Sequence, residues 1–424
     1  MSERRHKPGR SRRGAALVAV LWVGLLAGAL LLTVQQTAKL ELRQGHGELA
    51  RTQARWLARA GVEQAMAVLA DDDPGDDSEL DDWYADEASF EAVELATGSF
   101  SVRTPGEQGE PRWGLIDLAG RVNINAADEE QLAKVGELTP QQTAAILDWR
   151  DDDEQVRPGG AERGYYQRQP FPYEIRNDKL KTRAELRLVR GIDERTWSGE
   201  RTEEGSPFAD FAKPGLAELV TVRAYELNQD ASGRERINIS EANEDELRQS
   251  LSLSRGLARG IVSERDDSEF ESLMDLLDVE PESEEGDDEE EEGVTSEITL
   301  KWLADNLDRL TLSDEERIYG RINLNTASSE VLETLPEVGP AEAEAIIAHR
   351  GSSSGPLRSV GELLGVRGIE EDVFKAVAER VSVRSSVFEV TSVGTAPTGA
   401  RTTLTAIVDR ASEPAAIVYW QEGY

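Results

Sequence analysis

The sequence contains no cysteine and only three histidines. Without cysteine, the chain has no disulfide, no thiolate nucleophile and no cysteine-ligated zinc site. The histidines are far apart in the sequence: His6 lies in a basic stretch, His46 just after an apolar run, and His349 among alternating alanines and isoleucines. A catalytic histidine needs convergent partners. No enzyme class therefore has a usable set of residues here, and we expect a protein that is not an enzyme.

The chain has far fewer basic than acidic side chains. The chain of 424 residues has 83 Asp and Glu against 47 Lys and Arg, which gives a formal net charge of −36. Such a charge repels nucleic acid and anionic membrane surfaces. The length suffices for two or three domains.

One long hydrophobic run is present near the N-terminus. Ala15 to Val34 carry no charge, and about 20 such residues span a bilayer. The run exceeds the ~7–15 residues of a signal-peptide core, and no small-x-small cleavage site follows it. Six basic residues precede it, which places that end in the cytoplasm: Arg4, Arg5, Lys7, Arg10, Arg12 and Arg13. We predict a single transmembrane helix over residues 15–36 in the inner membrane, with the bulk of the chain in the periplasm.

The helix is predicted to continue beyond the membrane. From Lys39 to Ala70, small and apolar residues recur at helical spacing without a proline. A helix from Ala15 to Ala70 would be roughly 80 Å long at about 1.5 Å per residue. The acidic run from Asp71 to Asp82, with its Pro-Gly pair, ends it. The stretch is either an ordinary stalk or a spine that packs on its own head domain.

The junction at Gly14 and Ala15 favours a spine. Basic residues run into Gly14, and the apolar run begins at Ala15 without a spacer. This resembles the leader of pilins and pseudopilins, and the resemblance implies cleavage after Gly14 by prepilin peptidase and N-methylation of Ala15. Pilin-like proteins usually have Glu at the fifth mature position, where this chain has Ala19. That departure resembles the type II secretion minor pseudopilin K, whose place is the pseudopilus tip.

Strand-like stretches lie on both sides of a long middle region. They show β-branched residues and rough alternation, and they cover Gly98–Thr104, Trp113–Asn125, Ser386–Val393, Arg401–Asp409 and Ala415–Gln421. The predicted fold class is therefore α+β: a pilin-like spine helix with a small antiparallel sheet, interrupted by a large all-α insertion.

The middle region repeats. RVNINAADEEQL begins at Arg121, RINISEANEDEL at Arg236 and RINLNTASSEVL at Arg321, each with an N-capping pattern before an acidic first turn. Each copy continues into a second short helix that ends in Arg150, Arg265 or Arg350. These are helix-hairpin-helix-like units. The acidic tract 281–293 between the second and third units is predicted to be disordered.

The third unit also resembles the DNA-binding domain of competence proteins, which are membrane-anchored and exported. In that domain, glycine-bracketed hairpins hold a phosphate through backbone N–H groups and basic residues. Here the hairpin is Glu337-Val338-Gly339-Pro340, and residues 321–384 have seven basic against ten acidic side chains. A DNA-binding surface is normally net positive, so these features argue against nucleic acid as a partner.

The pseudopilin K resemblance covers the leader, the spine, GLIDLAGRVNINAA from Gly114 and the closing IVYW at Ile417–Trp420. It implies a leader over 1–14, a head over 37–118 and 385–424, and an inserted α-helical domain over 119–384. It also implies a subunit that initiates or forms the pseudopilus tip for protein export across the outer membrane. The expected partners are other minor pseudopilins, prepilin peptidase, the inner-membrane secretion assembly and secreted proteins. A membrane-anchored DNA-binding protein of a DNA-uptake system and an anchored scaffold unrelated to pili remain as alternatives.

Two acidic loops are candidate Ca²⁺ sites, because pseudopilin heads often use calcium. The candidate ligands are Asp71, Asp73, Asp76 and Asp77 in the first loop and the residues from Asp151 to Glu154 in the second. Neither loop fits the EF-hand pattern. A solvated run of like charges is the competing interpretation, and the sequence alone assigns no metal ligand.

Overall fold

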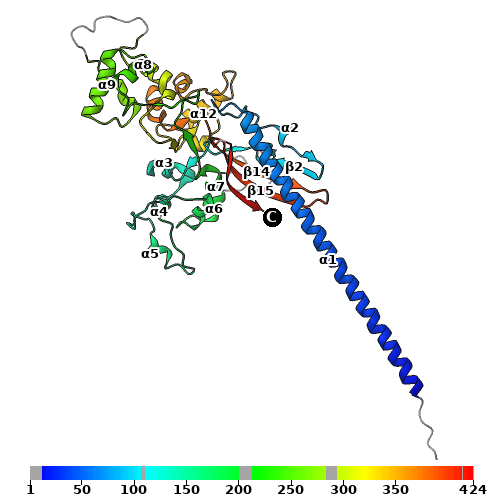
Figure 1. Ribbon diagram of the computed structural model, residues 1–424. Helices are drawn as coiled ribbons and strands as arrows, with labels where there is room; N and C mark the ends of the chain where they lie inside the picture. The colour runs from blue at the N-terminus through cyan, green and yellow to red at the C-terminus, as the bar shows by residue number, and fades with distance from the viewer. Residues whose placement is uncertain (1–11, 107–109, 200–212, 283–293, 413, 424) are drawn as a thin grey trace, which may run out of the picture.

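The computed structural model describes residues 12–106, 110–199, 213–282, 294–412 and 414–423. One long helix projects from a head that contains a sheet and a helical region (Figure 1). The fold class predicted from the sequence is confirmed. The leader residues 1–11 lie outside the described part, as does the acidic tract 281–293 apart from Pro281 and Glu282.

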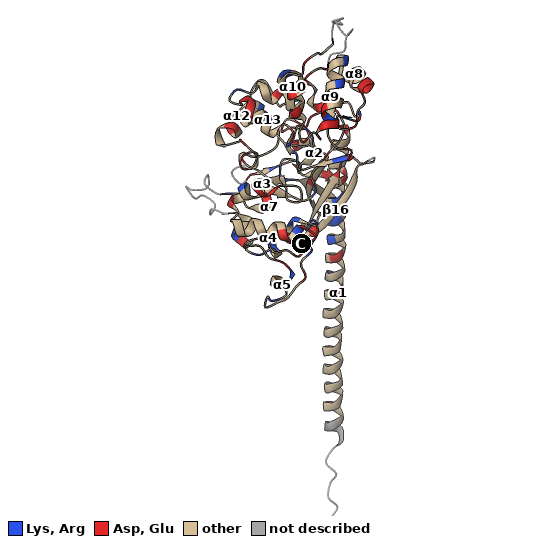
Figure 2. Cartoon of the chain, turned by 90° about the vertical axis from the view of Figure 1, so that its left-hand side faces the viewer, with Lys and Arg blue, Asp and Glu red and all other residues tan. Residues whose placement is uncertain are grey.

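The spine is helix α1, Arg12–Asp71, and it has two halves. Residues 16–49 include no buried side chain, and α1 contains an apolar stretch long enough to cross a membrane. Figure 2 shows its uncharged part projecting away from the head. From Ala50 onwards, one side of the helix is buried at helical spacing: Ala50, Ala54, Leu57, Ala58, Val62, Ala65 and Leu69.

The buried side of α1 packs on an antiparallel sheet. Its main path runs β1-β2-β14-β15-β16, and β5 pairs with the other end of β14. The strands are β1 Val93–Leu95, β2 Gly98–Val102, β5 Ile116–Asp117, β14 Val387–Thr395, β15 Arg401–Asp409 and β16 Ala416–Gly423. The three C-terminal strands were predicted to within two residues. The middle of the chain therefore leaves the sheet after β5 and returns at β14.

Small residues let the spine approach β14 closely. A Cβ atom on Gly394 would lie 2.0 Å from the Ala54 carbonyl oxygen, and one on Gly61 would lie 2.2 Å from Ser392 Oγ. Only glycine fits at such distances. The core beneath the spine is completed by Trp83, Phe90, Phe100, Phe388 and Val390 among others.

The predicted strand Trp113–Asn125 is wrong as a single element. It contains only β5 and β6, Val122–Asn123, which belong to different sheets. Between them the chain turns, because the Asp117 carboxylate accepts a hydrogen bond from the Ala119 N–H at 2.7 Å. The predicted strand Gly98–Thr104 likewise ends at Val102, and Thr104–Pro105 (β3) pairs with Pro111–Arg112 (β4).

Three helical units follow, and a two-residue parallel ladder closes each one. The ladders join β6 to β7 (Val220–Thr221), β9 (Ile237–Asn238) to β10 (Leu310–Thr311), and β12 (Ile322–Asn323) to β13 (Val381–Ser382). On the two sides of the second unit in the sequence, β8 (Tyr225–Leu227) pairs with β11 (Arg317–Tyr319). These short strands are an addition to the predicted all-α insertion.

Each unit contains the predicted helix pair and further short helices. The pairs are α3 (Glu129–Lys134) with α4 (Pro140–Arg150), α8 (Glu244–Leu251) with α9 (Arg255–Asp267), and α11 (Ser329–Leu332) with α12 (Pro340–Arg350). The remaining α-helices are α2 Glu87–Phe90, α5 Arg163–Tyr166, α6 Glu194–Ser198, α7 Leu216–Leu219, α10 Leu300–Asn306 and α13 Glu371–Val377. The units share one continuous hydrophobic core. The second and third units lie at the end of the molecule opposite the N-terminus of α1, whereas the first unit lies beside the sheet (Figures 1 and 2).

Candidate functional site

The N-terminal end of the spine holds the residues predicted from the leader. Gly14 and Ala15 lie within the first turns of α1, and Ala19 is exposed on the same helix. The exposed side chains on residues 16–34 are almost all apolar, including Leu17, Val20 and Trp22. This surface can face either lipid or another apolar helix.

The three hairpin tips share one backbone design. Each has a residue with positive φ, then a buried apolar residue, then the N-cap of the second helix. The positive-φ residue is Glu137 in the first unit, Ser252 in the second and Glu337 in the third. Two of the three tips therefore carry a carboxylate where a phosphate-binding hairpin carries glycine. A carboxylate at this position repels a phosphate.

The arginine that ends each second helix turns inward. In the third unit, Arg350 Nη1 donates to the carbonyl oxygens of Leu324 at 2.9 Å and Ala327 at 2.8 Å. Arg150 and Arg265 donate to the backbone carbonyls at the same offsets in their own units. These guanidinium groups hold the loop before the first helix, so they are not available to a nucleic-acid backbone.

The asparagines of the repeat motif are structural as well. Asn125 accepts a hydrogen bond from the Leu180 N–H and donates to its carbonyl oxygen. Asn325 makes the same pair of bonds with Leu357. Each asparagine thus ties the start of its unit to the segment that follows the helix pair. In the second unit Ser240 occupies this position.

The arginine that opens each repeat forms a buried ion pair. Arg321 Nη1 lies 3.0 Å from Glu226 Oε2, Arg384 Nη2 lies 2.8 Å from Glu226 Oε1, and Arg236 also contacts Glu226. Burial alone would raise the pKa of Glu226, but Arg321, Arg236 and Arg384 outweigh burial and lower its pKa to about 2. Glu226 therefore joins the second unit, the third unit and the chain that enters β14.

The first repeat is joined to the sheet in the same way. Arg121 lies 3.9 Å from Glu389 on β14, and Arg183 pairs with the same carboxylate. Together, Glu226 and Glu389 fix the helical units to the pilin-like head.

A cluster of three carboxylates lies in the first unit. Asp148 on α4, Asp151 at the C-terminus of α4 and Glu162 before α5 place oxygens within 4.8 Å of one another. Arg157 contacts Asp148 at 2.9 Å and also pairs with Asp151. Both carboxylate oxygens of Glu162 are buried and accept no hydrogen bond from any described residue. A Cβ atom on Gly160 would lie 2.0 Å from Asp148 Oδ2, so this loop approaches the cluster closely.

This cluster fits a hard divalent cation. Calcium takes oxygen ligands at about 2.4 Å, which allows two ligands to be up to about 4.8 Å apart. Burial and the neighbouring Asp148 and Asp151 raise the pKa of Glu162 to about 7, which is the behaviour of a buried carboxylate without a cation. A cation at this position would also give the two unpartnered oxygens of Glu162 a ligand.

The loop candidates from the sequence are only partly brought together. Asp151 belongs to the cluster, whereas Asp152 and Asp153 are exposed and Glu154 pairs with Arg163 at 3.1 Å. Asp148 and Glu162 were missed because 13 residues separate them in the sequence. In the other acidic loop, Asp77 meets Asp72 and Asp81, while Asp71 and Asp73 are exposed and Asp76 is outside the cluster.

Comparisons with known proteins give consistent results. A family model described as "Type II secretion system (T2SS), protein K" matches residues 120–199, and a helix-hairpin-helix motif matches residues 319–382. The type II secretion system protein K of Pectobacterium carotovorum subsp. carotovorum is 29% identical over 211 residues, and that of Klebsiella pneumoniae is 26% identical over 193 residues. Each alignment covers 43% of this chain and about 60% of the relative's length.

Two further similarities concern the motif and the fold. ComE operon protein 1 of Bacillus subtilis is 36% identical over 63 residues, which cover 15% of this chain and 30% of that protein. The crystal structure of the GspK-GspI-GspJ complex from the type II secretion system of enterotoxigenic Escherichia coli matches with a TM-score of 0.50 at 13% identity. The match covers 90% of this chain and 99% of the solved chain, and at 13% identity it concerns the fold alone.

Proposed function

We propose that this chain, which is similar to the protein K family of type II secretion systems in sequence and fold, is a minor pseudopilin that forms or initiates the pseudopilus tip for protein export across the outer membrane. The observation that carries this proposal is the position of the second and third helical units beyond the sheet, at the end of the head opposite the N-terminus of α1 (Figures 1 and 2). In a filament, the head of another pilin-like subunit cannot occupy the space that these helical units fill. It can therefore lie only at the end of a filament.

The proposal assigns the spine two roles. Residues 15–36 hold the protein in the inner membrane as a single span, with the leader in the cytoplasm and the head in the periplasm. Prepilin peptidase removes residues 1–14, and Ala15 becomes the N-methylated N-terminus. A carboxylate in lipid is costly without a partner. Ala19 lacks that group, so the subunit has no need of a neighbour's terminal amine above it.

We propose that the exported part consists of a head and an inserted domain. The head comprises residues 37–118 and 385–424, and the inserted domain comprises 119–384. The described surface works by contact, without an enzyme reaction. The solved relative was crystallised with GspI and GspJ, and this supports two other minor pseudopilins as partners. Prepilin peptidase and the inner-membrane secretion assembly act on the anchor, and secreted proteins would meet the exposed helical units.

Co-purification tests the assembly. The tagged head, starting near Ala38 so that the exposed apolar half of α1 is removed, should retain the two other minor pseudopilins of the same secretion system. A matched variant with Trp56→Ala, which alters an exposed aromatic residue on the spine, measures how much of the retention depends on α1. Failure of the unaltered head and of the full-length chain to retain either partner would contradict the proposal.

We also propose that Asp148, Asp151 and Glu162 hold Ca²⁺. The cation would supply positive charge to the buried carboxylates and would fix the loop 151–162 against α4. The residues of this chain provide the oxygens, and Arg157 orients Asp148 and Asp151.

DNA binding for uptake is the competing function, and the helix-hairpin-helix match favours it. The inward arginines and the acidic hairpin tips oppose it. A gel-shift titration decides between them: a shift with a steep salt dependence would establish DNA binding. We expect no shift at moderate salt.

A further inference from the structure

A groove lies between the first helical unit and the sheet. Two adjoining cavities of about 200 Å³ and about 410 Å³ form it, and both have Lys181, Val222 and Arg223 in their walls. The first cavity is also lined by Tyr419 on β16, and the second by Tyr319 on β11. Two cavities side by side can hold an extended chain that passes from one to the other.

The groove is on the face of the sheet that the spine leaves uncovered. On β15, Leu404, Ala406 and Val408 belong to the core beneath α1, whereas Thr405 and Ile407 line the groove. Successive side chains of a strand point to opposite faces of the sheet. Packing of α1 on the sheet therefore does not block the groove, and the first helical unit forms its other wall.

The charge of the groove is opposite in sign to that of the whole chain. Four basic side chains and two acidic ones line the two cavities: Lys179, Lys181, Arg183 and Arg223 against Asp178 and Glu389. The chain as a whole has 83 acidic against 47 basic side chains. At physiological salt, charges are screened beyond about 8 Å. The nearby cations therefore dominate the field inside the groove and attract an anion.

Most of these cations are not used by the fold. Arg183 pairs with Glu389, but Lys179, Lys181 and Arg223 form no ion pair with a described residue. Arg223 Nη2 donates to the Lys181 carbonyl oxygen at 3.3 Å. Its Nε atom is buried and donates to no acceptor in the described part of the chain. A buried donor without an acceptor costs free energy, and a bound carboxylate would remove that cost.

Aromatic rings lie beside the unpaired cations. The Arg223 guanidinium is 5.8 Å from the centroid of the Tyr419 ring, and Lys179 Nζ is 5.8 Å from that of Tyr319. Trp197 on α6 is a third aromatic residue in the wall. The tyrosine rings attract the two cations, and all three rings offer apolar surface to a ligand. Arginine together with aromatic side chains is typical of surfaces that bind another protein.

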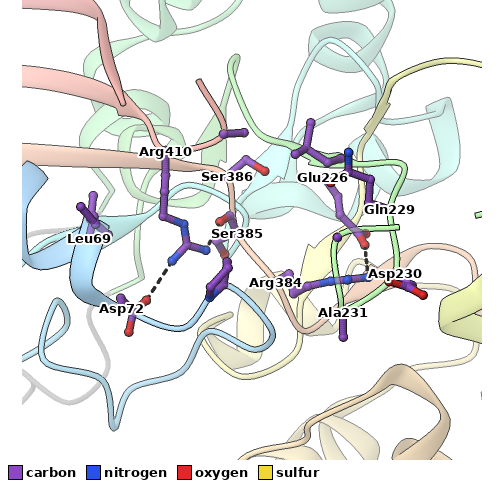
Figure 3. Close-up of a pocket in the computed structure, with 15 residues that line it drawn as sticks. Leu69, Asp72, Glu226, Gln229, Asp230, Ala231, Arg384, Ser385, Ser386 and Arg410 are labelled. Carbon is purple, nitrogen blue, oxygen red and sulfur yellow. Dashed lines mark hydrogen bonds and ion pairs between the residues drawn. The ribbon is translucent and has the colours of Figure 1, made fainter. Parts of the chain in front are cut away.

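The cavity in Figure 3 differs from the groove in this respect. It is lined by Arg410 and Arg384, and the figure shows Arg410 extended toward Asp72. Arg410 lies 2.8 Å from Asp72 Oδ2, and Arg384 lies 2.8 Å from Glu226 Oε1. Both arginines of that cavity are therefore neutralised by carboxylates of the chain itself, whereas the cations of the groove are available to a ligand.

We propose that this groove, which we call the basic groove, binds an extended acidic peptide segment of a partner protein. Carboxylates of the segment accept hydrogen bonds from Lys179, Lys181 and Arg223, as in other sites that recognise acidic motifs. Apolar side chains of the segment contact Trp197 and Tyr419. A single chain can enter the groove, whereas a broad anionic membrane surface would meet the net charge of −36 on the rest of the protein.

Fluorescence anisotropy tests the basic groove. Binding there does not require assembly into a filament, so the full-length chain in a non-ionic detergent is used, with a fluorescein-labelled hexaglutamate peptide as the probe. We expect saturable binding that weakens as salt is added, and no binding of labelled hexaglutamine. Lys181→Gln should raise the dissociation constant at least about threefold, and Lys181→Gln combined with Arg223→Gln at least about tenfold.

Lys375→Gln is the matched control, because it removes the same charge at an exposed position on α13, outside the groove. It should leave the dissociation constant unaltered. Circular dichroism and the melting temperature establish that each variant is folded. Equal dissociation constants for Lys181→Gln and Lys375→Gln would overturn the proposal, as would a folded native chain that does not bind hexaglutamate. Displacement of the peptide by phosphatidylglycerol in the same micelles would assign the groove to a lipid headgroup and would overturn it as well.

Discussion

Arg321 donates to Glu226 at 3.0 Å across 95 residues of sequence. Arg321 opens the third repeat, and Glu226 lies on β8 before the second repeat. The same carboxylate also pairs with Arg236, which opens the second repeat. The arginine that begins a repeat in the sequence thus forms an ion pair that connects two helical units.

The first prediction concerns this joint. Glu226→Gln leaves Arg236 and Arg384 with Asp308 as their carboxylate partner and removes the carboxylate that Arg321 contacts. Removing one member of a buried charge group costs about 3–5 kcal/mol, so we expect the free energy of unfolding to fall by that amount. Urea unfolding followed by circular dichroism measures it. Glu315→Gln, at an exposed position, should change stability by less than about 0.5 kcal/mol.

The second prediction is the pH dependence that Glu226 confers. Its pKa is about 2 in the folded chain, against an ordinary value of 4.5 for a glutamate, so its contribution to stability is fully present above pH 4.5. The contribution is lost as pH falls toward 2, because the unfolded chain takes up the proton first. A shift of this size corresponds to about 3 kcal/mol. The stability gap between the native chain and Glu226→Gln should narrow between pH 5 and pH 3, and a constant gap would contradict the assignment.

The third prediction tests the contact between spine and sheet. Gly394→Ala places a Cβ atom 2.0 Å from the Ala54 carbonyl oxygen, and neither backbone can move away without opening the core. We expect a loss of about 1–3 kcal/mol in the free energy of unfolding. Gly365→Ala is the control, because its Cβ would meet no atom within 4 Å. Equal melting temperatures for the two variants would show that α1 does not pack on β14 this closely.

The fourth prediction concerns the leader. Replacing Gly14 removes the small residue that the leader resemblance places before the cleavage point, so prepilin peptidase should leave the variant uncut. Intact-mass spectrometry of membrane-extracted protein should find residues 1–14 retained in the variant. The unaltered chain should begin at an N-methylated Ala15. An unprocessed native chain, in a host with active prepilin peptidase, would exclude a pseudopilin.

The fifth prediction concerns the Asp148 cluster. Saturating Ca²⁺ should stabilise the chain by about 2.7 kcal/mol at a hundred times the dissociation constant of one site. The Glu162→Gln variant should lose most of the stabilisation that Ca²⁺ binding at this cluster provides, because Glu162 is the cluster member with two unpartnered oxygens. The Asp152→Asn variant alters an exposed residue of the same loop, and Ca²⁺ should stabilise it as much as the unaltered chain. Thermal melting with Ca²⁺ and with chelator provides the comparison.

Local patterns predicted much of this architecture. The apolar run at Ala15 and the helical spacing up to Ala70 agree with α1, and the capping patterns after Arg121, Arg236 and Arg321 agree with three helix pairs. The closing strands were also predicted, since alternation and turns are properties of neighbouring residues. The single strand over Trp113–Asn125 failed because one side chain, Asp117, turns the chain within the run.

The sequence by itself determined the long apolar helix, the three repeats and the family resemblance, because each rests on residues close together in the chain. Only the tertiary structure decided what the charged residues do. It turned Arg150, Arg265 and Arg350 toward backbone carbonyls, and it brought Glu162 to Asp148. The physical reason is that burial and ion pairing depend on distances in space, and folding sets these distances between residues that are far apart in the sequence.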